Sequence, residues 1–387
     1  MAAPDVERTW EKVLRAPFRL VFYPLRLVAR GSQYVVTVGS DLIGYEPRLV
    51  PWLGVKAAPV VGISGTSGPS AGVAVQGRSG LGSRASLVGT WSTKDTRRIR
   101  LRAGITEPGE RIGVEIYGAY DYRPNRRFYG LGNETTLDGK TIYLRRENVG
   151  EASVFIGQNP HRRVRGMFSI SDVNVGAGYR DAPRAQDVYS PDDVPFLVEE
   201  SSVTSFGGAF DLGFLDNHLN PSMGVHFRGE ARRFDSIDNS GVHYNSWYAE
   251  SRAYVPVLAP RRVIALRYIY QGVDPRGDTE VPFYRMPVSG EQARFAAFRS
   301  NRFMDRQLML GHAEYRWIVL PQYTVWAHVF GQLGAVASEQ QGFTLQSAHR
   351  SIGGGFRAVL SPSTTARLEI ANGDEGTRVY VDLRGDF

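Results

Sequence analysis

The chain has 387 residues, a formal net charge of +7, 42% hydrophobic residues and no cysteine. The missing cysteines exclude disulfides, thiolate metal sites and thiol nucleophiles, and no stretch approaches the ~20 apolar residues of a membrane-spanning helix. Hydrophobic residues are nevertheless too frequent and too evenly spread for a disordered chain.

The basic residues are unusual in kind and in distribution. Only four of the 46 are lysines, and arginines recur at every second position of apolar runs instead of forming clusters. A positive charge can attract nucleic acid or anionic lipid, but nucleic-acid-binding proteins gather their basic residues into a patch. We therefore expect no nucleic-acid partner.

The first predicted element, residues 8–30, has the periodicity of a helix. Its basic residues are three, four or seven positions apart, and apolar residues cover much of the remaining surface; the stripe includes Arg15, Arg19, Arg26 and Arg30. Pro17 and Pro24 should divide it into two short helices. Such a segment is typical of a membrane interface, although it would also suit packing on another protein or on a barrel rim. We treat residues 1–50 as an N-terminal amphipathic segment.

Residues 51–387 alternate between apolar and polar side chains, which is the pattern of β-strands with two different faces. Around residue 227, for example, Val225 and Phe227 alternate with His226 and Arg228. The stretch 55–68 is an alternative first strand. We predict sixteen strands, near residues 70–78, 83–93, 97–105, 111–122, 139–147, 150–158, 162–180, 201–213, 222–236, 244–257, 261–273, 306–319, 323–335, 350–360, 363–372 and 377–387.

Two folds have strands of this kind, a β-sandwich and a transmembrane β-barrel. A sandwich turns its polar face to bulk water, where Lys and Glu are usual, whereas here that face is rich in Arg, Glu, Asp and His, which suit an enclosed lumen. Many strands also reach the about 9–11 residues that a tilted membrane-spanning strand needs. We therefore predict an all-β fold, a 16-stranded antiparallel transmembrane β-barrel. The side chains expected in its lumen are Arg228, Glu230, Arg267, Glu314, Arg316, Arg367, Glu369 and Asp382.

The longest connection between predicted strands is residues 274–305. Pro275, Pro282 and Pro287 exclude a hidden strand pair there. A loop of this length on a barrel is usually functional or folded into the lumen.

Signatures of enzymes are missing from the sequence: it contains no GxSxG, P-loop, HExxH or GxGxxG motif. His243 and Ser246 could suggest a barrel-borne lipase, but ordinary polar residues at a strand end explain them better. We expect no enzymatic activity, no cofactor and no metal.

Three stretches carry further motifs. Residues 127–133 read RFYGLGN, with Phe128, Gly130, Gly132 and Asn133 at the positions of an F-Y/F-G-[IL]-G-N turn. Residues 295–306 read FAAFRSNRFMDR and are followed by Glu-Tyr-Arg at 314–316. The ending, 350–387, contains three successive glycines and closes on Tyr380, Leu383 and the terminal Phe387. In this order the motifs resemble the BamA/TamA surface-antigen superfamily of outer-membrane barrels.

The resemblance implies a location in the bacterial outer membrane and a role in inserting or translocating other outer-membrane proteins, or as the membrane platform of such a complex. The implied partners are outer-membrane lipids and periplasmic proteins or lipoproteins of the complex. It also implies a weak seam between the first and last strands, whose opening offers an edge for β-augmentation. The alternative is a passive pore or structural anchor that has lost this activity.

The sequence departs from the family pattern in two places. Only residues 1–50 precede the predicted barrel, too few for one of the family's POTRA modules. In the long loop, Ala296 and Ala297 align with the family's Arg-Gly, whose arginine pairs with luminal acids. We therefore expect Arg299 or Arg302 to replace it, paired with Glu314 or a neighbouring acid; the other residues assigned to this site are Asp305, Arg306 and Arg316.

Overall fold

A computed structural model of the chain describes most of residues 56–382. The described ranges are 56–64, 68–78, 83–105, 111–159, 161–179, 182–218, 220–238, 240–257, 259–290, 293–320, 325–339, 342–344, 346–361 and 364–382. The predicted segment 8–30, with Arg15, Arg19, Arg26 and Arg30, lies outside these residues, as do Leu383 and Phe387.

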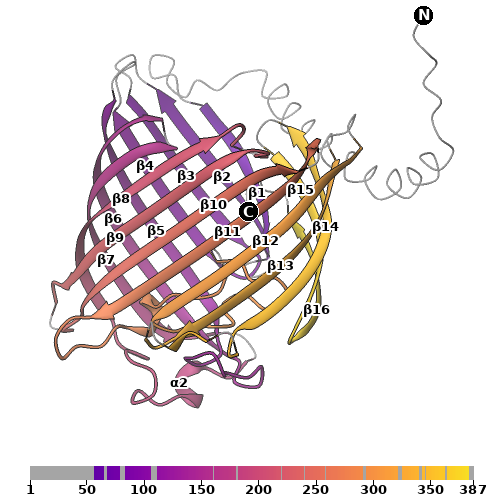
Figure 1. The fold of residues 1–387 in the computed structure, drawn as a ribbon. Helices are drawn as coiled ribbons and strands as arrows, with labels where there is room; N and C mark the ends of the chain where they lie inside the picture. Colours follow the sequence, from indigo (N-terminus) through magenta and orange to yellow (C-terminus); the bar gives the residue numbers. More distant parts are fainter. Residues whose placement is uncertain are drawn as a thin grey trace, which may run out of the picture.

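The described residues form one antiparallel sheet of sixteen strands, in which each strand pairs with the next along the chain. The sheet curls into a barrel with steeply tilted strands (Figure 1). No helix in the described ranges is long and apolar enough to cross a membrane. The strands are β1 (Lys56–Ser64), β2 (Gly68–Arg78), β3 (Ser83–Ser92), β4 (Arg97–Ile105), β5 (Ile112–Phe128), β6 (Thr141–Asn159), β7 (Arg162–Ala177), β8 (Ser201–Leu215), β9 (Gly224–Ser236), β10 (His243–Val257), β11 (Ala259–Pro275), β12 (Gln307–Leu320), β13 (Val325–Ala337), β14 (His349–Ser361), β15 (Thr364–Gly373) and β16 (Gly376–Asp382).

The individual strands differ from the expected ones at the N-terminal end. Residues 139–147 and 150–158, expected as two strands, are the single strand β6, and β1 lies within the alternative first strand at 55–68. Gly150, the expected first residue of the second strand, pairs within β6 with Gly118 and Ile170, and the place of its missing side chain is open space. A glycine that faces away from the lumen therefore does not interrupt the strand.

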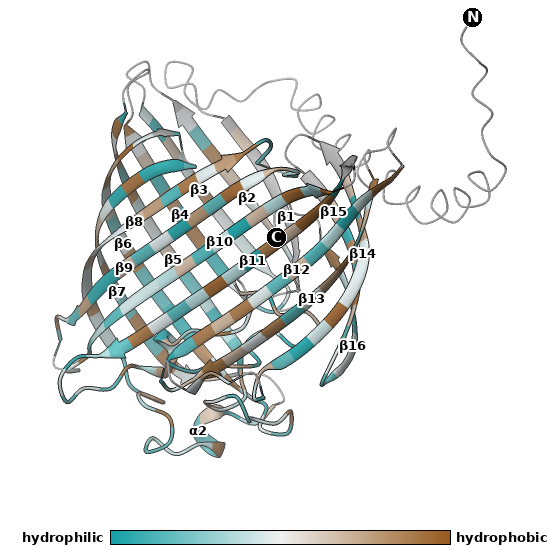
Figure 2. Cartoon of the chain, in the orientation of Figure 1, coloured by the Kyte–Doolittle hydropathy of each residue, from teal (hydrophilic) through white to brown (hydrophobic). Residues whose placement is uncertain are grey.

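The two faces of the sheet have the predicted character. On β8, Phe206, Phe210 and Phe214 are 57%, 42% and 52% exposed on the outside, whereas Ser205 and Ala209, on the opposite face of the strand, are buried. Figure 2 shows the same alternation of hydropathy along the strands. A shift of one residue would turn every apolar side chain inward, so the apolar outer surface specifies the register.

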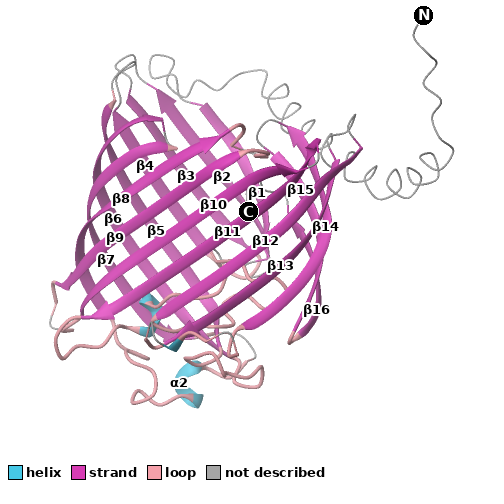
Figure 3. Ribbon diagram, in the orientation of Figure 1, coloured by secondary structure: helices cyan, strands magenta, loops and turns pink. Residues whose placement is uncertain are grey.

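The connections at the two ends of the barrel differ in length. At one end, which we call the loop end, long segments such as 129–140, 178–200 and 276–306 gather, together with the short helix α2 (Ala185–Val188) (Figure 3). The other end, here the turn end, carries short connections such as the one between β6 and β7. Among the described residues, the loop end therefore holds most of the irregular structure.

Between β1 and β16 the ladder is interrupted. Within the described residues β1 pairs with β2 and β16 pairs with β15, and no pairing joins β1 to β16. The edges of these two strands thus mark a seam in the barrel wall.

Candidate functional site: the luminal loop and its wall

The connection between β11 and β12, residues 276–306, lies inside the barrel, and we call it the luminal loop. It contains one 3-10 turn, η2 (Phe283–Arg285). On one side, Tyr284 Oη donates to Ser201 Oγ of β8 at 2.9 Å, and Arg285 Nη2 donates to Ser171 Oγ of β7 at 2.8 Å. On the other side the loop contacts β13, β15 and β16. It therefore spans the lumen from wall to wall.

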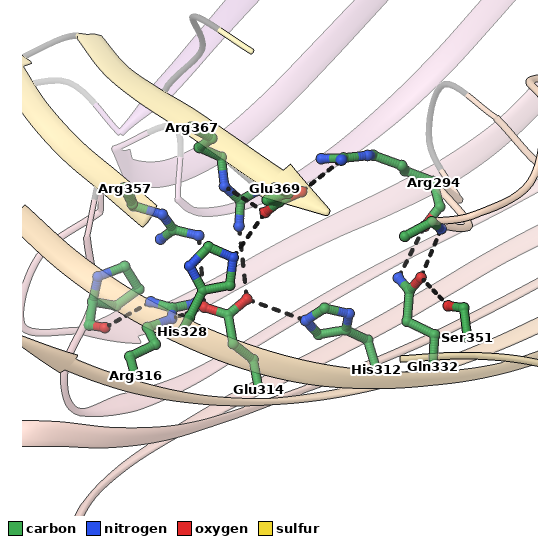
Figure 4. Close-up of polar contacts among 12 residues, drawn as sticks. Arg294, His312, Glu314, Arg316, His328, Gln332, Ser351, Arg357, Arg367 and Glu369 are labelled. Carbon is green, nitrogen blue, oxygen red and sulfur yellow. Dashed lines mark hydrogen bonds and ion pairs between the residues drawn. The ribbon is translucent and has the colours of Figure 1, made fainter. Parts of the chain in front are cut away.

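Four adjacent strands, β12 to β15, carry a buried charge network that we call the wall network (Figure 4). Glu314 of β12 is only 2% exposed and pairs with Arg316 on the same strand. Its carboxylate oxygens also lie 3.3 Å from His312 Nε2, 3.7 Å from Arg357 Nη2 and 3.6 Å from Arg367 Nη2. One carboxylate thus faces three guanidinium groups from three strands.

A second acid, Glu369 of β15, completes the wall network. Its Oε1 lies 3.2 Å from Arg367 Nε and 3.0 Å from His328 Nε2, and its Oε2 accepts a hydrogen bond from Arg294 Nη2 at 2.6 Å. Arg294 belongs to the luminal loop, so this pair joins the loop to the wall (Figure 4).

The glycines of β14 make the wall network possible. Gly355 is the register partner of His328 on β13 and of Glu369 on β15, and so lies between them. A Cβ at this position would lie 2.1 Å from the carbonyl oxygen of Leu368. Because the strand has no side chain here, the imidazole and the carboxylate can meet across it.

The central part of the luminal loop is attached to the last two strands. Besides the Arg294–Glu369 pair, Arg378 Nε of β16 donates to the carbonyl oxygen of Ala297 at 3.0 Å. The guanidinium of Arg294 lies 4.6 Å from the ring centroid of Tyr380, also on β16. Tyr380, which the sequence assigned to the C-terminal signal, thus faces the lumen and the loop.

Of the acids expected as partners of Arg299 or Arg302, Glu314 is not the one that binds; Arg302 pairs with a different acid, Glu375. Arg302 is 3% exposed and pairs with Glu375, in the turn between β15 and β16, and its Nη1 donates to Thr135 Oγ1 at 2.6 Å. Glu314 is already surrounded by arginines of the wall. Arg299 contributes its backbone carbonyl oxygen, which accepts from Arg302 N at 3.2 Å.

Arg294, which the sequence analysis did not single out, takes the place expected for the loop arginine. Ala296, 3% exposed, packs with Phe330 and Ala371 in a small apolar cluster. Ala297 has a φ of +70°, a conformation that favours glycine, the family residue at the aligned position. Arg294 thus lies two residues before Ala296, the position that aligns with the family's arginine. The sequence feature that could have indicated its role is its place directly before Phe295, where the loop motif begins.

The turn motif at 128–133 supports the luminal loop from the side of β5. Gly132 N donates to the carbonyl oxygen of Met304 at 2.9 Å, and Val336 N of β13 donates to Asn133 Oδ1 at 3.1 Å. Gly130 and Gly132 have φ angles of +92° and +99°. Phe128 is fully buried in the cluster at the loop end. The motif therefore has a structural role in positioning the loop.

Asp305 and Arg306 lead from the loop into β12. Asp305 is buried and accepts a hydrogen bond from Arg306 N at 2.7 Å. Burial raises the pKa of its carboxyl group above the ordinary value. The carbonyl oxygen of Arg306 accepts from Val273 N on β11. These two residues fix the start of β12 and take no part in the wall network.

An apolar cluster, which we call the apolar seal, lies at the loop end of the lumen. Phe283 of the luminal loop is fully buried against Phe128 and Tyr143, with ring centroids 5.0 Å and 4.9 Å away, and Met304 is 1% exposed. The cluster also includes Tyr244 of β10. In the part of the chain that the structure describes, no three His, Asp or Glu residues gather as metal ligands. The lumen thus offers charged groups and hydrogen bonds behind an apolar seal.

No protein-family model and no curated protein sequence matches the chain. Among solved structures, BamA from Haemophilus ducreyi lacking POTRA domains 1–3 aligns with a TM-score of 0.64 and 13% identity, over 86% of this chain and 70% of that chain. CdiB from Escherichia coli aligns with a TM-score of 0.51 and 10% identity, over 85% of this chain and 62% of CdiB. At such identities the likeness concerns the fold. The chain has the fold of a BamA-type barrel.

Proposed function

We propose that this chain is a barrel of the bacterial outer membrane that assists the insertion or translocation of other outer-membrane proteins, or forms the membrane platform of such a complex. The observation that carries the proposal is the interrupted ladder between β1 and β16 in the described residues. An unpaired strand edge is a template for the strand of another protein.

The lengths of the strands support this role for the seam. β15, next to the last strand, has 10 residues, whereas β5 and β6, further round the barrel, have 17 and 19. Shorter strands span less of the hydrocarbon layer, so a bilayer that matches the barrel would be thinner beside the seam. A thinner bilayer lowers the cost of bringing a new strand to the edge.

The luminal loop is positioned to influence the seam. Arg294, Arg302 and the carbonyl oxygen of Ala297 are bound to Glu369, Glu375 and Arg378, all on β15, β16 or the turn between them. We infer that the loop holds the last hairpin in place while the seam opens on the side of β1. Outer-membrane lipids and periplasmic proteins or lipoproteins are the proposed partners, with residues 1–50 as a candidate attachment segment.

The alternative is a passive pore or a structural anchor. The apolar cluster at the loop end argues against an open pore, because Phe283 and Met304 are buried where a channel would have to pass. The same filled lumen is compatible with an anchor. An anchor would not need an open seam, and this difference allows a test.

Since the chain has no cysteine, an engineered pair of cysteines would form the protein's only disulfide. Val379→Cys would be combined in turn with cysteine at positions 57–61 of β1, and each variant reconstituted in liposomes with and without oxidant. The folding of a urea-denatured outer-membrane barrel into these liposomes would be followed by its protease resistance. We expect several-fold faster folding than in empty liposomes, loss of that gain when the seam is locked, and recovery with reductant.

The matched control is Leu87→Cys with Leu101→Cys, which are register partners on β3 and β4, where the wall is already paired. Its disulfide should leave the rate unchanged. A well-folded barrel that gives no acceleration at all, or one that keeps its acceleration with the seam locked, would support the anchor instead.

A further inference from the structure

The lumen carries a second set of charges, on strands that take no part in the wall network. Several arginines in the turn-end half of β3, β4, β7 and β9 point inward, because their neighbours along each strand, such as Leu101 and Val164, are exposed apolar residues of the outer surface. We call this set the basic arc; its members are Arg84, Arg100, Arg102, Arg163, Arg165 and Arg228. The Arg102 side chain faces inward and is still 63% exposed, so the lumen beside the arc is open to solvent.

The acids beside the basic arc are shared between several cations. Oε1 of Glu115 on β5 lies 3.3 Å from Arg102 Nε, and its Oε2 lies 3.9 Å from Arg163 Nη1. Asp211 of β8 lies 2.8 Å from His226 Nε2. Each of these carboxylates therefore already has a partner within the barrel.

Three guanidinium groups of the basic arc form no ion pair with any described residue. The next acids along the wall, Glu151 and Glu230, are bound to Arg232 at 2.7 Å and 2.6 Å. The arginines that remain unpaired among the described residues are Arg84, Arg100 and Arg165. Like charges on one wall repel each other, and a bound anion would relieve this repulsion.

The turn end gives a ligand access to the basic arc before it can reach the wall network. The connection between β8 and β9 folds onto the wall network: Arg316 Nη1 donates to the carbonyl oxygen of Pro221 at 3.4 Å, and Arg357 Nη1 donates to Asn220 Oδ1 at 3.5 Å. Arg84 and Arg100 of the arc are exposed, whereas the arginines of the wall network are buried. A ligand that enters from the turn end therefore meets the arc first.

The unpaired arginines are too widely spread for one small anion. Arg84 and Arg165 lie on β3 and β7, four strand spacings apart, which is about 19 Å along the wall. An extended chain of about six residues covers that distance. Its alternate side chains are about 6.6 Å apart, the same repeat as that of Arg100 and Arg102 along β4. Because a guanidinium binds a carboxylate through two parallel hydrogen bonds, a row of alternate acidic residues fits the arc.

We propose that the basic arc binds an acidic, extended segment of another polypeptide, which enters the lumen from the turn end. In outer-membrane barrels the short turns face the periplasm, so the partner is a periplasmic protein with Asp or Glu at alternate positions. The proposal rests on the outer-membrane location proposed above, and not on the seam or on the assembly activity. Peptide binding in micelles requires neither of the latter, so the two proposals can fail separately.

The experiment measures binding of a labelled peptide to the full chain in micelles of an uncharged detergent, by fluorescence anisotropy. The probe is a peptide of eight residues in which Glu and Thr alternate, and the control peptide has Gln in place of each Glu. We expect only the Glu peptide to bind, and we expect its affinity to fall as salt is added, because salt screens exposed charges. Inorganic polyphosphate, carrying the same label, is measured separately as an alternative polyanion.

Variants of the unpaired arginines locate the site. The combination of Arg84→Gln, Arg100→Gln and Arg165→Gln should weaken peptide binding at least tenfold. The matched control has the same change in net charge on exposed arginines of the outer surface and should stay within twofold of the unaltered chain; it combines Arg146→Gln, Arg233→Gln and Arg350→Gln.

A variant with the opposite effect provides the second arm of the test. Glu115→Gln removes the carboxylate that binds Arg102 and Arg163, so both guanidinium groups become available to the peptide. We expect Glu115→Gln to strengthen binding severalfold, a gain that damage to the fold would not produce. Circular dichroism and the heat-modifiable gel shift confirm that each variant is folded.

Several results would overturn the proposal. They are equal affinities for the Glu and Gln peptides, equal losses in the two triple variants, or binding in Glu115→Gln that is unchanged or weaker. Polyphosphate binding that depends on the three arginines, without binding of the Glu peptide, would assign the arc to a phosphate polymer and would also overturn it.

Discussion

Glu314 has the environment of a residue whose loss would be costly. It is 2% exposed, and Arg316, Arg357 and Arg367 all direct guanidinium groups toward its carboxylate. A buried ion pair adds little net stability, because desolvation offsets much of the attraction, but removal of one partner leaves the other charge buried and uncompensated. Here one carboxylate compensates several arginines at once.

We therefore expect Glu314→Gln to destabilise the barrel by about 3–5 kcal/mol, the range observed when a buried pair loses one partner. The measurement is the urea midpoint of unfolding in detergent micelles. Arg233→Gln is the control, because Arg233 is 50% exposed in its pair with Asp235 and such pairs contribute about 1 kcal/mol or less. Equal midpoints for the two variants would contradict the role of Glu314 as the centre of the wall network.

Gly355 permits a second prediction at the scale of single residues. A Cβ there would overlap the carbonyl oxygen of Leu368 and separate His328 from Glu369. Gly355→Ala should cost about 1–3 kcal/mol as an overpacked substitution, whereas Gly331→Ala, which meets nothing within 4 Å, should be close to neutral. The same urea titration compares them, and equal costs would show that space at Gly355 is not critical.

The luminal loop acts as an element whose position depends on a few attachments. We expect Arg294→Gln to free the central part of the loop from β15 and β16, because Glu369 and the ring of Tyr380 both lose their contact with the guanidinium. Limited chymotrypsin digestion should then cut at Phe295 or Phe298, which are otherwise buried. Arg299→Gln is the control, and no change in digestion for Arg294→Gln would show that other contacts hold the loop.

The period of two in the sequence predicts which residues face the lumen, because side-chain direction in a strand depends only on local alternation. Glu314 and Arg316 were placed on the inner face in this way, and both are buried. Their partners were not predictable to the same degree. Arg302 pairs with Glu375 and Arg294 with Glu369, across 73 and 75 positions of sequence. Such pairs depend on where the loop folds against the wall, and local periodicity carries no information about that.

At the scale of the whole molecule, the loop end of the barrel contains an apolar cluster and the wall is rich in arginine. Phe283 and Met304 belong to the apolar seal. Further from the loop end, the residues of the wall network in Figure 4 include more guanidinium groups than carboxylates. The positive electrostatic potential of this excess of guanidinium groups attracts anions into the lumen. The unaltered chain should nevertheless conduct little, because the seal excludes water and ions.

Opening the seal should therefore reveal an anion-selective pore. In planar bilayers with a potassium chloride gradient, we expect rare, small conductance steps for the unaltered chain. Replacing residues 281–303 by a short Gly-Ser linker removes Phe283, Arg294 and the attachments to β15 and β16. This variant should give stable conductance steps whose reversal potential has the sign expected for a chloride-selective pore. The linker variant carrying Arg357→Gln and Arg367→Gln should be less selective, because these guanidinium groups then no longer face the pore. Cation selectivity in the linker variant, or open conductance in the unaltered chain, would contradict this account of the lumen.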